Sequence, residues 1–149
     1  MVSKILVPID GSKAAQKAAR YAVNLAKQLK ALVIVLSVID QRLLINQAML
    51  GTGTAMIAIE PIENYLQEAA EKYVRDMKKL CEKNGVQSKA VIITGHPVEE
   101  IVKEAKKSKA DLIVMGSHGR SALAAAVLGS VVYGVIHNET KTPILVVRR

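Results

Sequence analysis

The chain has 149 residues, the length of a single domain, and we expect one domain over residues 1–149. Half of the residues are hydrophobic and 23% are charged, which is typical of a folded globular protein and excludes a disordered chain. Lysine and arginine outnumber aspartate and glutamate by 21 to 13, giving a net charge of +8. The aromatic residues are four tyrosines, so the composition disfavours a protein that grips single-stranded nucleic acid by stacking bases on aromatic rings.

Cysteine usage and the longest apolar runs bear on where the protein works. Cys81 is the single cysteine and the first residues lack a signal-peptide pattern, so we expect no disulfides and a cytoplasmic location. The charge-free runs at 43–59 and 121–136 are shorter than the roughly 20 apolar residues that span a bilayer. Both runs also contain glycine and polar residues, so we expect no transmembrane segment.

The first forty residues predict a strand, a helix and a second strand. Residues 4–9 (KILVPI) are apolar, and Asp10, Gly11 and Ser12 after them are typical of a turn and a helix N-cap. Over residues 12–29, alanines and leucines recur at helical spacing, with lysines and an arginine opposite, which predicts an amphipathic helix with a small buried side. Residues 32–39 (LVIVLSVI) are again apolar, as in parallel strands covered on both faces.

The next stretch, residues 41–60, has no regular pattern and is expected to be an irregular connection. Gly51 and Gly53 interrupt a run of apolar residues, and no helix or strand is assigned there. Three interpretations remain open: a lid over a ligand, a segment that contacts a partner, and a partly ordered loop.

The rest of the chain alternates helices and strands. A helix is predicted over 61–84, beginning with Pro61 at its first turn, because proline suits that position. Strands are predicted over 86–93, 111–115 and 144–147, and helices over 97–107 and 130–138. The alternation predicts an α/β fold with a doubly wound parallel sheet and helices on both faces, and the strands are too few for a barrel.

Ligands of doubly wound sheets bind at the carboxyl ends of the strands, where the winding reverses. The loops after the first and fourth strands carry Asp10 and the run Gly116-Ser117-His118-Gly119, and Gly129-Ser130 open the last helix. Glycines and free amides at a helix start suit phosphate, and a carboxylate suits ribose hydroxyls. Each residue alone is an ordinary turn or cap residue, but the set at fixed offsets is rarely accidental.

The pattern G-x2-G-x9-G-[ST], formed by Gly116, Gly119, Gly129 and Ser130, resembles the ATP-binding signature of the universal stress protein family. The likeness extends to the KILVPIDGS opening, the DLIVMGSHGR run and the TPILVV tail, and leaves out only residues 41–60. It implies five parallel strands in the order 3-2-1-4-5, an adenine nucleotide alpha hydrolase-like fold, and a nucleotide between strands one and four.

The resemblance also implies a role for each site residue. Asp10 would hold the ribose beside Gly116, and Val38 would meet adenine through its backbone. The residues implied to flank the adenine are Pro8, Ile9 and Met115, and those implied to face the phosphates are His118, Gly119, Gly129, Ser130 and Val131. Arg120 and Val132 are also expected at the nucleotide site, and Val132 stands where some members have a hydroxyl residue that reaches the outer phosphate. The implied ligand is ATP, with AMP or ADP as alternatives, and Mg²⁺ or Mn²⁺ would be held through the phosphates and water.

The function predicted on these grounds is an ATP-binding switch in the stress response. A slow metal-dependent ATP hydrolase or phosphotransferase is the first alternative, although P-loop and kinase motifs are absent. A regulatory protein that binds a polyanion through Lys13, Lys17 and Arg20 of the first helix is the second.

The last predicted strand is expected to carry the contact between two copies of the chain. Ile144, Leu145, Val146 and Val147 would form an edge of the sheet with few charges nearby. An apolar edge strand of this kind can pair with a copy of itself, so a homodimer is expected.

Overall fold

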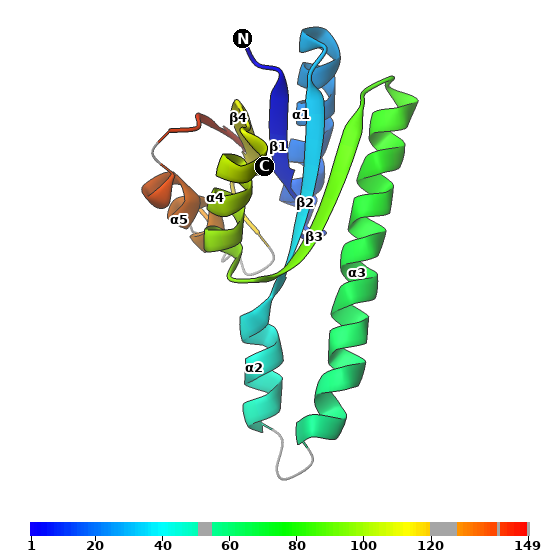
Figure 1. The fold of residues 1–149 in the computed structure, drawn as a ribbon, viewed down its shortest axis with the longest axis vertical. Helices are drawn as coiled ribbons and strands as arrows, with labels where there is room; N and C mark the ends of the chain where they lie inside the picture. The colour runs from blue at the N-terminus through cyan, green and yellow to red at the C-terminus, as the bar shows by residue number, and fades with distance from the viewer. Residues whose placement is uncertain (51–54, 120–127, 140, 149) are drawn as a thin grey trace.

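The computed structural model describes residues 1–50, 55–119, 128–139 and 141–148, with side chains described outside residues 46–60. The elements in chain order are β1 (Lys4–Pro8), α1 (Lys13–Leu29), β2 (Leu32–Asp40), α2 (Gln41–Leu50), α3 (Ala55–Lys83), β3 (Ser88–Gly95), α4 (Pro97–Ser108), β4 (Leu112–Gly116), α5 (Ser130–Asn138) and β5 (Ile144–Val147). The strands pair in parallel in the order β3-β2-β1-β4-β5, which confirms the predicted doubly wound sheet (Figure 1).

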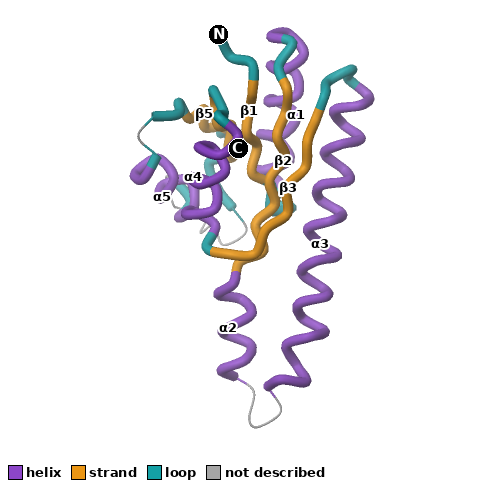
Figure 2. The backbone as a smooth tube through the Cα atoms, in the orientation of Figure 1, coloured by secondary structure: helices purple, strands orange, loops and turns teal. Residues whose placement is uncertain are grey.

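Helices cover both faces of the sheet, as Figure 2 shows, because alternate strand residues are apolar on each side. One core lies against α1 and α3 and includes Ile5, Val7, Val33, Val35, Ala18, Ala22, Val74 and Met77. The other lies against α4 and α5 and includes Leu6, Ile34, Leu36, Ile113, Ile101, Ala105, Val132 and Val135. No helix in the described ranges is long and apolar enough to cross a membrane.

The helix α1 begins where the sequence predicts. The Ser12 hydroxyl accepts a hydrogen bond from the Ala15 amide at 3.1 Å, which satisfies one of the free N–H groups of the first turn. The alanines of α1 face the sheet, whereas Lys13, Lys17 and Arg20 are exposed to solvent. The small buried side chains let α1 lie close to the strands.

Residues 41–60 differ from the expected irregular connection. Helix α2 follows β2 directly, and α3 begins at Ala55, so Pro61 lies inside a helix and not at its first turn. The helix start predicted from Pro61 is therefore wrong. A proline inside a helix costs one intrahelical hydrogen bond, and the helix continues through it where other contacts offset that cost. Together α2 and α3 extend beyond the carboxyl ends of the strands (Figure 1).

The start of β3 also differs from the prediction, by two residues. Gly85 has a φ of 68°, and the Val86 amide donates to the Cys81 carbonyl at 2.9 Å, so residues 85 and 86 cap α3. Val86 is buried by this contact with α3 rather than as part of a strand.

The middle of the sheet is joined by a short pairing. Between β1 and β4, Ile5 lies opposite Leu112 and Leu6 opposite Ile113, whereas the β2–β3 pairing runs from Val33 to Asp40. At the amino ends of β1 and β4, Asp111 Oδ2 accepts hydrogen bonds from the Ser3 amide and hydroxyl and from the Lys4 amide. Within β1 and β4 as described, the pairing ends at Leu6 and Ile113, so the two strands are not paired with each other toward their carboxyl ends.

Candidate functional site

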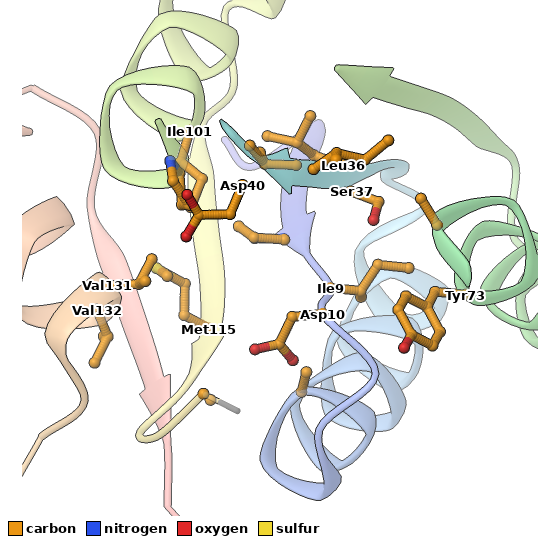
Figure 3. Close-up of a pocket in the computed structure, with 18 of the residues that line it drawn as sticks. Ile9, Asp10, Leu36, Ser37, Asp40, Tyr73, Ile101, Met115, Val131 and Val132 are labelled. Carbon is orange, nitrogen blue, oxygen red and sulfur yellow. The ribbon is translucent and has the colours of Figure 1, made fainter. Parts of the chain in front are cut away.

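The cleft lies at the carboxyl ends of β1, β2 and β4 and encloses a cavity of about 260 Å³. In Figure 3, Val131 and Val132 of α5 lie on one side of it and Ile9 and Tyr73 on the other, with Asp10 between them. This is the position where the winding of the sheet reverses, because β1 has β2 on one side and β4 on the other.

The loop after β1 orients the Asp10 carboxylate. Asp10 Oδ1 accepts a hydrogen bond from the Ser12 amide at 2.9 Å, forming a tight turn that leads into α1. Gly11, between them, has a φ of 81°, in the left-handed region that favours glycine. The second oxygen, Oδ2, points toward the loop after β4, since a Cβ built on Gly119 would lie 3.0 Å from it.

The loop after β4 is closed at its base by backbone contacts. The Ser117 amide donates to the Val147 carbonyl at 2.9 Å, and the Gly129 amide donates to the Ser117 carbonyl at 2.7 Å. A Cβ on Gly129 would lie 3.1 Å from His118 Cα, so glycine lets the two ends of the loop meet. The buried Ser117 hydroxyl lies 2.9 Å from His118 Nδ1 and orients that ring.

The amino end of α5 supplies free amides to the cavity. The first intrahelical bond runs from the Tyr133 amide to the Gly129 carbonyl at 3.0 Å, so the amides of Ser130, Val131 and Val132 precede it. All three residues line the cavity. Amides at a helix start carry partial positive charge, so this side of the cleft favours an anion.

The carboxyl end of β2 carries a charge pair. Asp40 Oδ2 lies 2.7 Å from Arg42 Nη2, and Asp40 Oδ1 accepts the Arg42 amide at 3.0 Å. Burial alone would raise the pKa of the Asp40 carboxyl, but the hydrogen bonds and charge of Arg42 outweigh it and lower that pKa. Asp40 is therefore an ionised, paired group. Within the described ranges, no group of three or more His, Cys, Asp or Glu side chains is placed to hold a metal ion.

Most of the residues predicted from the sequence meet at this cleft. Those that line it are Pro8, Ile9, Asp10, Val38, Met115, Gly116, His118, Gly119, Ser130, Val131 and Val132. Gly129 lies behind the lining, against His118, and Arg120 lies outside the described residues.

The family follows from comparison with known proteins. A model described as the Universal stress protein family matches residues 1–148. The chain belongs to the universal stress protein family. Universal stress protein MJ0577 of Methanocaldococcus jannaschii is 40% identical to it over 158 residues, which cover 100% of this chain and 96% of the relative.

Solved structures of universal stress proteins share the fold. The MJ0577 structure aligns with a TM-score of 0.85 at 36% identity and covers 100% of this chain and 97% of the other. UspA from Lactobacillus plantarum aligns with a TM-score of 0.84 at 26% identity, covering 99% and 98%. A universal stress protein crystallised in complex with cAMP is 25% identical, with a TM-score of 0.67 and coverage of 99% and 97%.

One wall of the cleft in this universal stress protein was missed by sequence reasoning. Leu43 of α2 and a stripe of α3 line the cavity, and the stripe consists of Leu66, Ala69, Ala70 and Tyr73. The helical spacing of the stripe was visible in the sequence, but it is also the pattern of an ordinary core-facing helix. Ser37, Asp40, Arg42, Pro97 and Ile101 also line the cavity and were not predicted.

Proposed function

We propose that this universal stress protein binds an adenine nucleotide, with ATP as its ligand, and that the bound nucleotide acts as a regulatory switch in the stress response. The proposal rests on one cavity that is lined by the Asp10 carboxylate, by aliphatic side chains such as Ile9 and Met115, and by the amino end of α5. These groups match ribose hydroxyls, a purine and phosphates in turn. The complex of a family member with cAMP supports the same class of ligand.

The proposal assigns each part of the nucleotide to a side of the cleft. Adenine meets the backbone of Val38 and is flanked by Ile9 and Met115, which line the cavity. The ribose hydroxyls donate to Asp10, whose carboxylate is oriented by the Ser12 amide. The phosphates receive hydrogen bonds from the amides at Gly119 and at the start of α5. A divalent cation, if bound, is held by the phosphates and water.

The cleft favours binding over hydrolysis. Hydrolysis of ATP needs a positioned base, stabilisation of charge at the γ-phosphate and a metal ion. Asp40 is paired with Arg42, and Asp10 accepts a hydrogen bond from Ser12 while serving the ribose in this assignment. Val132 has no hydroxyl to offer a metal ion or the outer phosphate. These features favour binding of ATP without its hydrolysis.

Calorimetric titration with ATP tests the proposal. We expect saturable binding by the unaltered protein and an affinity about tenfold or more lower for Asp10→Ala, because a hydrogen bond to a charged group is worth about 1.5–3 kcal/mol. Asp76→Ala, at an exposed α3 carboxylate that pairs with Lys72, is the matched control and should bind as the unaltered protein does. Absence of binding heat from the unaltered protein would contradict the proposal.

We also propose that two copies of the chain pair through β5. This strand is at an edge of the sheet, and its residues are only partly buried. An apolar edge strand exposes unpaired N–H and C=O groups that a second copy can satisfy. A two-fold dimer made in this way uses the same strand from both partners.

A further inference from the structure

Tyr73 of α3 lines the cleft but has no part in the nucleotide contacts proposed above. Along α3, Leu66, Ala70 and Tyr73 lie at helical spacing and line the cavity. The small Ala70 leaves space in the middle of the wall, whereas Tyr73 extends toward the β1 loop beside Ile9 and Asp10 (Figure 3). Tyr73 is half-buried and packs against the core that contains its neighbour Val74.

The ring of Tyr73 occupies the space in which Gly11 would carry a side chain. A Cβ built on Gly11 would lie 2.5 Å from Tyr73 Cε1 and 2.7 Å from Tyr73 Oη, distances that real Cβ atoms do not show. The φ of 81° at Gly11 also disfavours any residue with a side chain. The aromatic ring therefore lies against the backbone of Gly11, on the side where any other residue would carry its Cβ.

The contact between Tyr73 and Gly11 lies next to Asp10, the residue proposed to bind the ribose. Gly11 lies between Asp10 and Ser12, and the hydrogen bond from the Ser12 amide to Asp10 Oδ1 spans it. Displacement of Gly11 would rotate the turn and change the direction of the carboxylate. A tyrosine has few side-chain torsions, so a ring packed on α3 is a firm support for the turn.

We propose that Tyr73 is a positioning residue for Asp10, holding the Gly11 turn so that the carboxylate faces the sugar of the bound nucleotide. The inference rests on the proposed adenine-nucleotide function. It adds a residue on which the preference for nucleotides with ribose hydroxyls over those without them depends. Tyr73 acts through Gly11 and does not itself need to touch the ligand.

Comparison of ATP with 2′,3′-dideoxy-ATP tests the role of Tyr73, because the second nucleotide lacks the hydroxyls that Asp10 would bind. We expect the unaltered protein to prefer ATP by about tenfold or more, the worth of a hydrogen bond to a charged group. In Tyr73→Ala the preference should fall below about threefold, since the carboxylate is no longer held in place, while the affinity for dideoxy-ATP should change little. Tyr73→Leu, measured in parallel, should behave likewise and provides a second variant if the alanine form does not fold.

A control on the same helix accompanies these variants. Tyr65→Ala, at a tyrosine of α3 that is 67% exposed, should keep the preference for ATP.

Three results would overturn the inference and leave the proposed nucleotide binding in place. The first is an unchanged preference in both Tyr73→Ala and Tyr73→Leu, and the second is an equal loss of affinity for both nucleotides. The third is equal affinity of the unaltered protein for ATP and dideoxy-ATP, which would remove the role of Tyr73 and leave ATP binding intact. Failure of the unaltered protein to bind either nucleotide would overturn the proposed function and, with it, this inference.

Discussion

Gly11 and Gly85 adopt the same left-handed conformation in different surroundings. Their φ values are 81° and 68°, and they are the two glycines with positive φ in the described part of the chain. A Cβ on Gly11 would meet Tyr73, whereas a Cβ on Gly85 would have no atom within 4 Å. The pair therefore separates the cost of backbone strain from the cost of a side-chain clash.

Substitution of each glycine by alanine should show this difference. We expect Gly85→Ala to lower the free energy of unfolding by about 1 kcal/mol, the cost of left-handed backbone for a residue with Cβ. Gly11→Ala should cost about 1–3 kcal/mol more, because the ring of Tyr73 must also move. Urea unfolding of the two variants measures both values. Equal losses would mean that the Tyr73 contact has no energetic weight.

Individual site residues were predictable where they lie in local motifs. Asp10, Gly119 and Ser130 follow or precede elements whose ends are visible in the sequence, and all three line the cavity. Tyr73 was not predictable, because its contact with Gly11 depends on how α3 lies against the β1 loop. Spacing within a helix gives the face that is buried but not the residue that the face meets.

The existence of α2 and the start of α3 could not be predicted from sequence patterns. Residues 41–60 contain two glycines and no regular spacing of polar and apolar residues, so the pattern does not indicate a helix, yet α2 occupies 41–50. Pro61 favours a helix start, although α3 begins at Ala55. Helices α2 and α3 lie against each other, and contacts of this kind, from which most helices in proteins gain their stability, are not visible in a single sequence.

The amino ends of β1 and β4 provide a prediction about pH. The amide and hydroxyl of Ser3 and the amide of Lys4 donate to Asp111 and lower the pKa of that carboxyl. A lowered pKa means that the ionised form stabilises the fold above the ordinary pKa, and that this stabilisation is lost as pH falls through the lowered value. Asp111→Asn should therefore be less stable than the unaltered protein near pH 7, and the difference should shrink below about pH 4.

Urea unfolding at several pH values between neutral and acid measures this difference. Ser3→Ala, which removes one donor and keeps the two amides, should show a smaller effect in the same direction. A difference that stays constant down to acid pH would contradict the role of the Asp111 carboxylate.

At the scale of the whole molecule, pairing of two chains through β5 can be tested by removing a backbone amide of β5 that faces away from the sheet. The carbonyl of Pro143 accepts the amide of Ile113 in β4, and that of Val147 accepts the amide of Ser117 just after β4. By the alternation of a strand, the Leu145 amide therefore faces β4 and the Val146 amide faces away. Val146→Pro therefore removes an outward donor and keeps the pairing with β4. Leu145→Pro removes a bond within the sheet and destabilises the fold itself.

Sedimentation at micromolar concentration distinguishes these outcomes. We expect the unaltered protein at twice the 16.1 kDa of one chain and Val146→Pro at the mass of one chain, with the fold retained. An unaltered protein that sediments as a single chain would contradict pairing through β5. A dimer that persists in Val146→Pro would assign the contact to another surface.

The pairing between β1 and β4 is the shortest in the sheet, with two residue pairs. With Ile5 opposite Leu112 and Leu6 opposite Ile113 as its residue pairs, the half containing β3, β2 and β1 is tied to the half containing β4 and β5 by few backbone bonds. Asp10 belongs to the first half, and the start of α5 belongs to the second. A nucleotide bound as proposed would contact both halves, so we expect its binding to stabilise the folded protein across this short pairing.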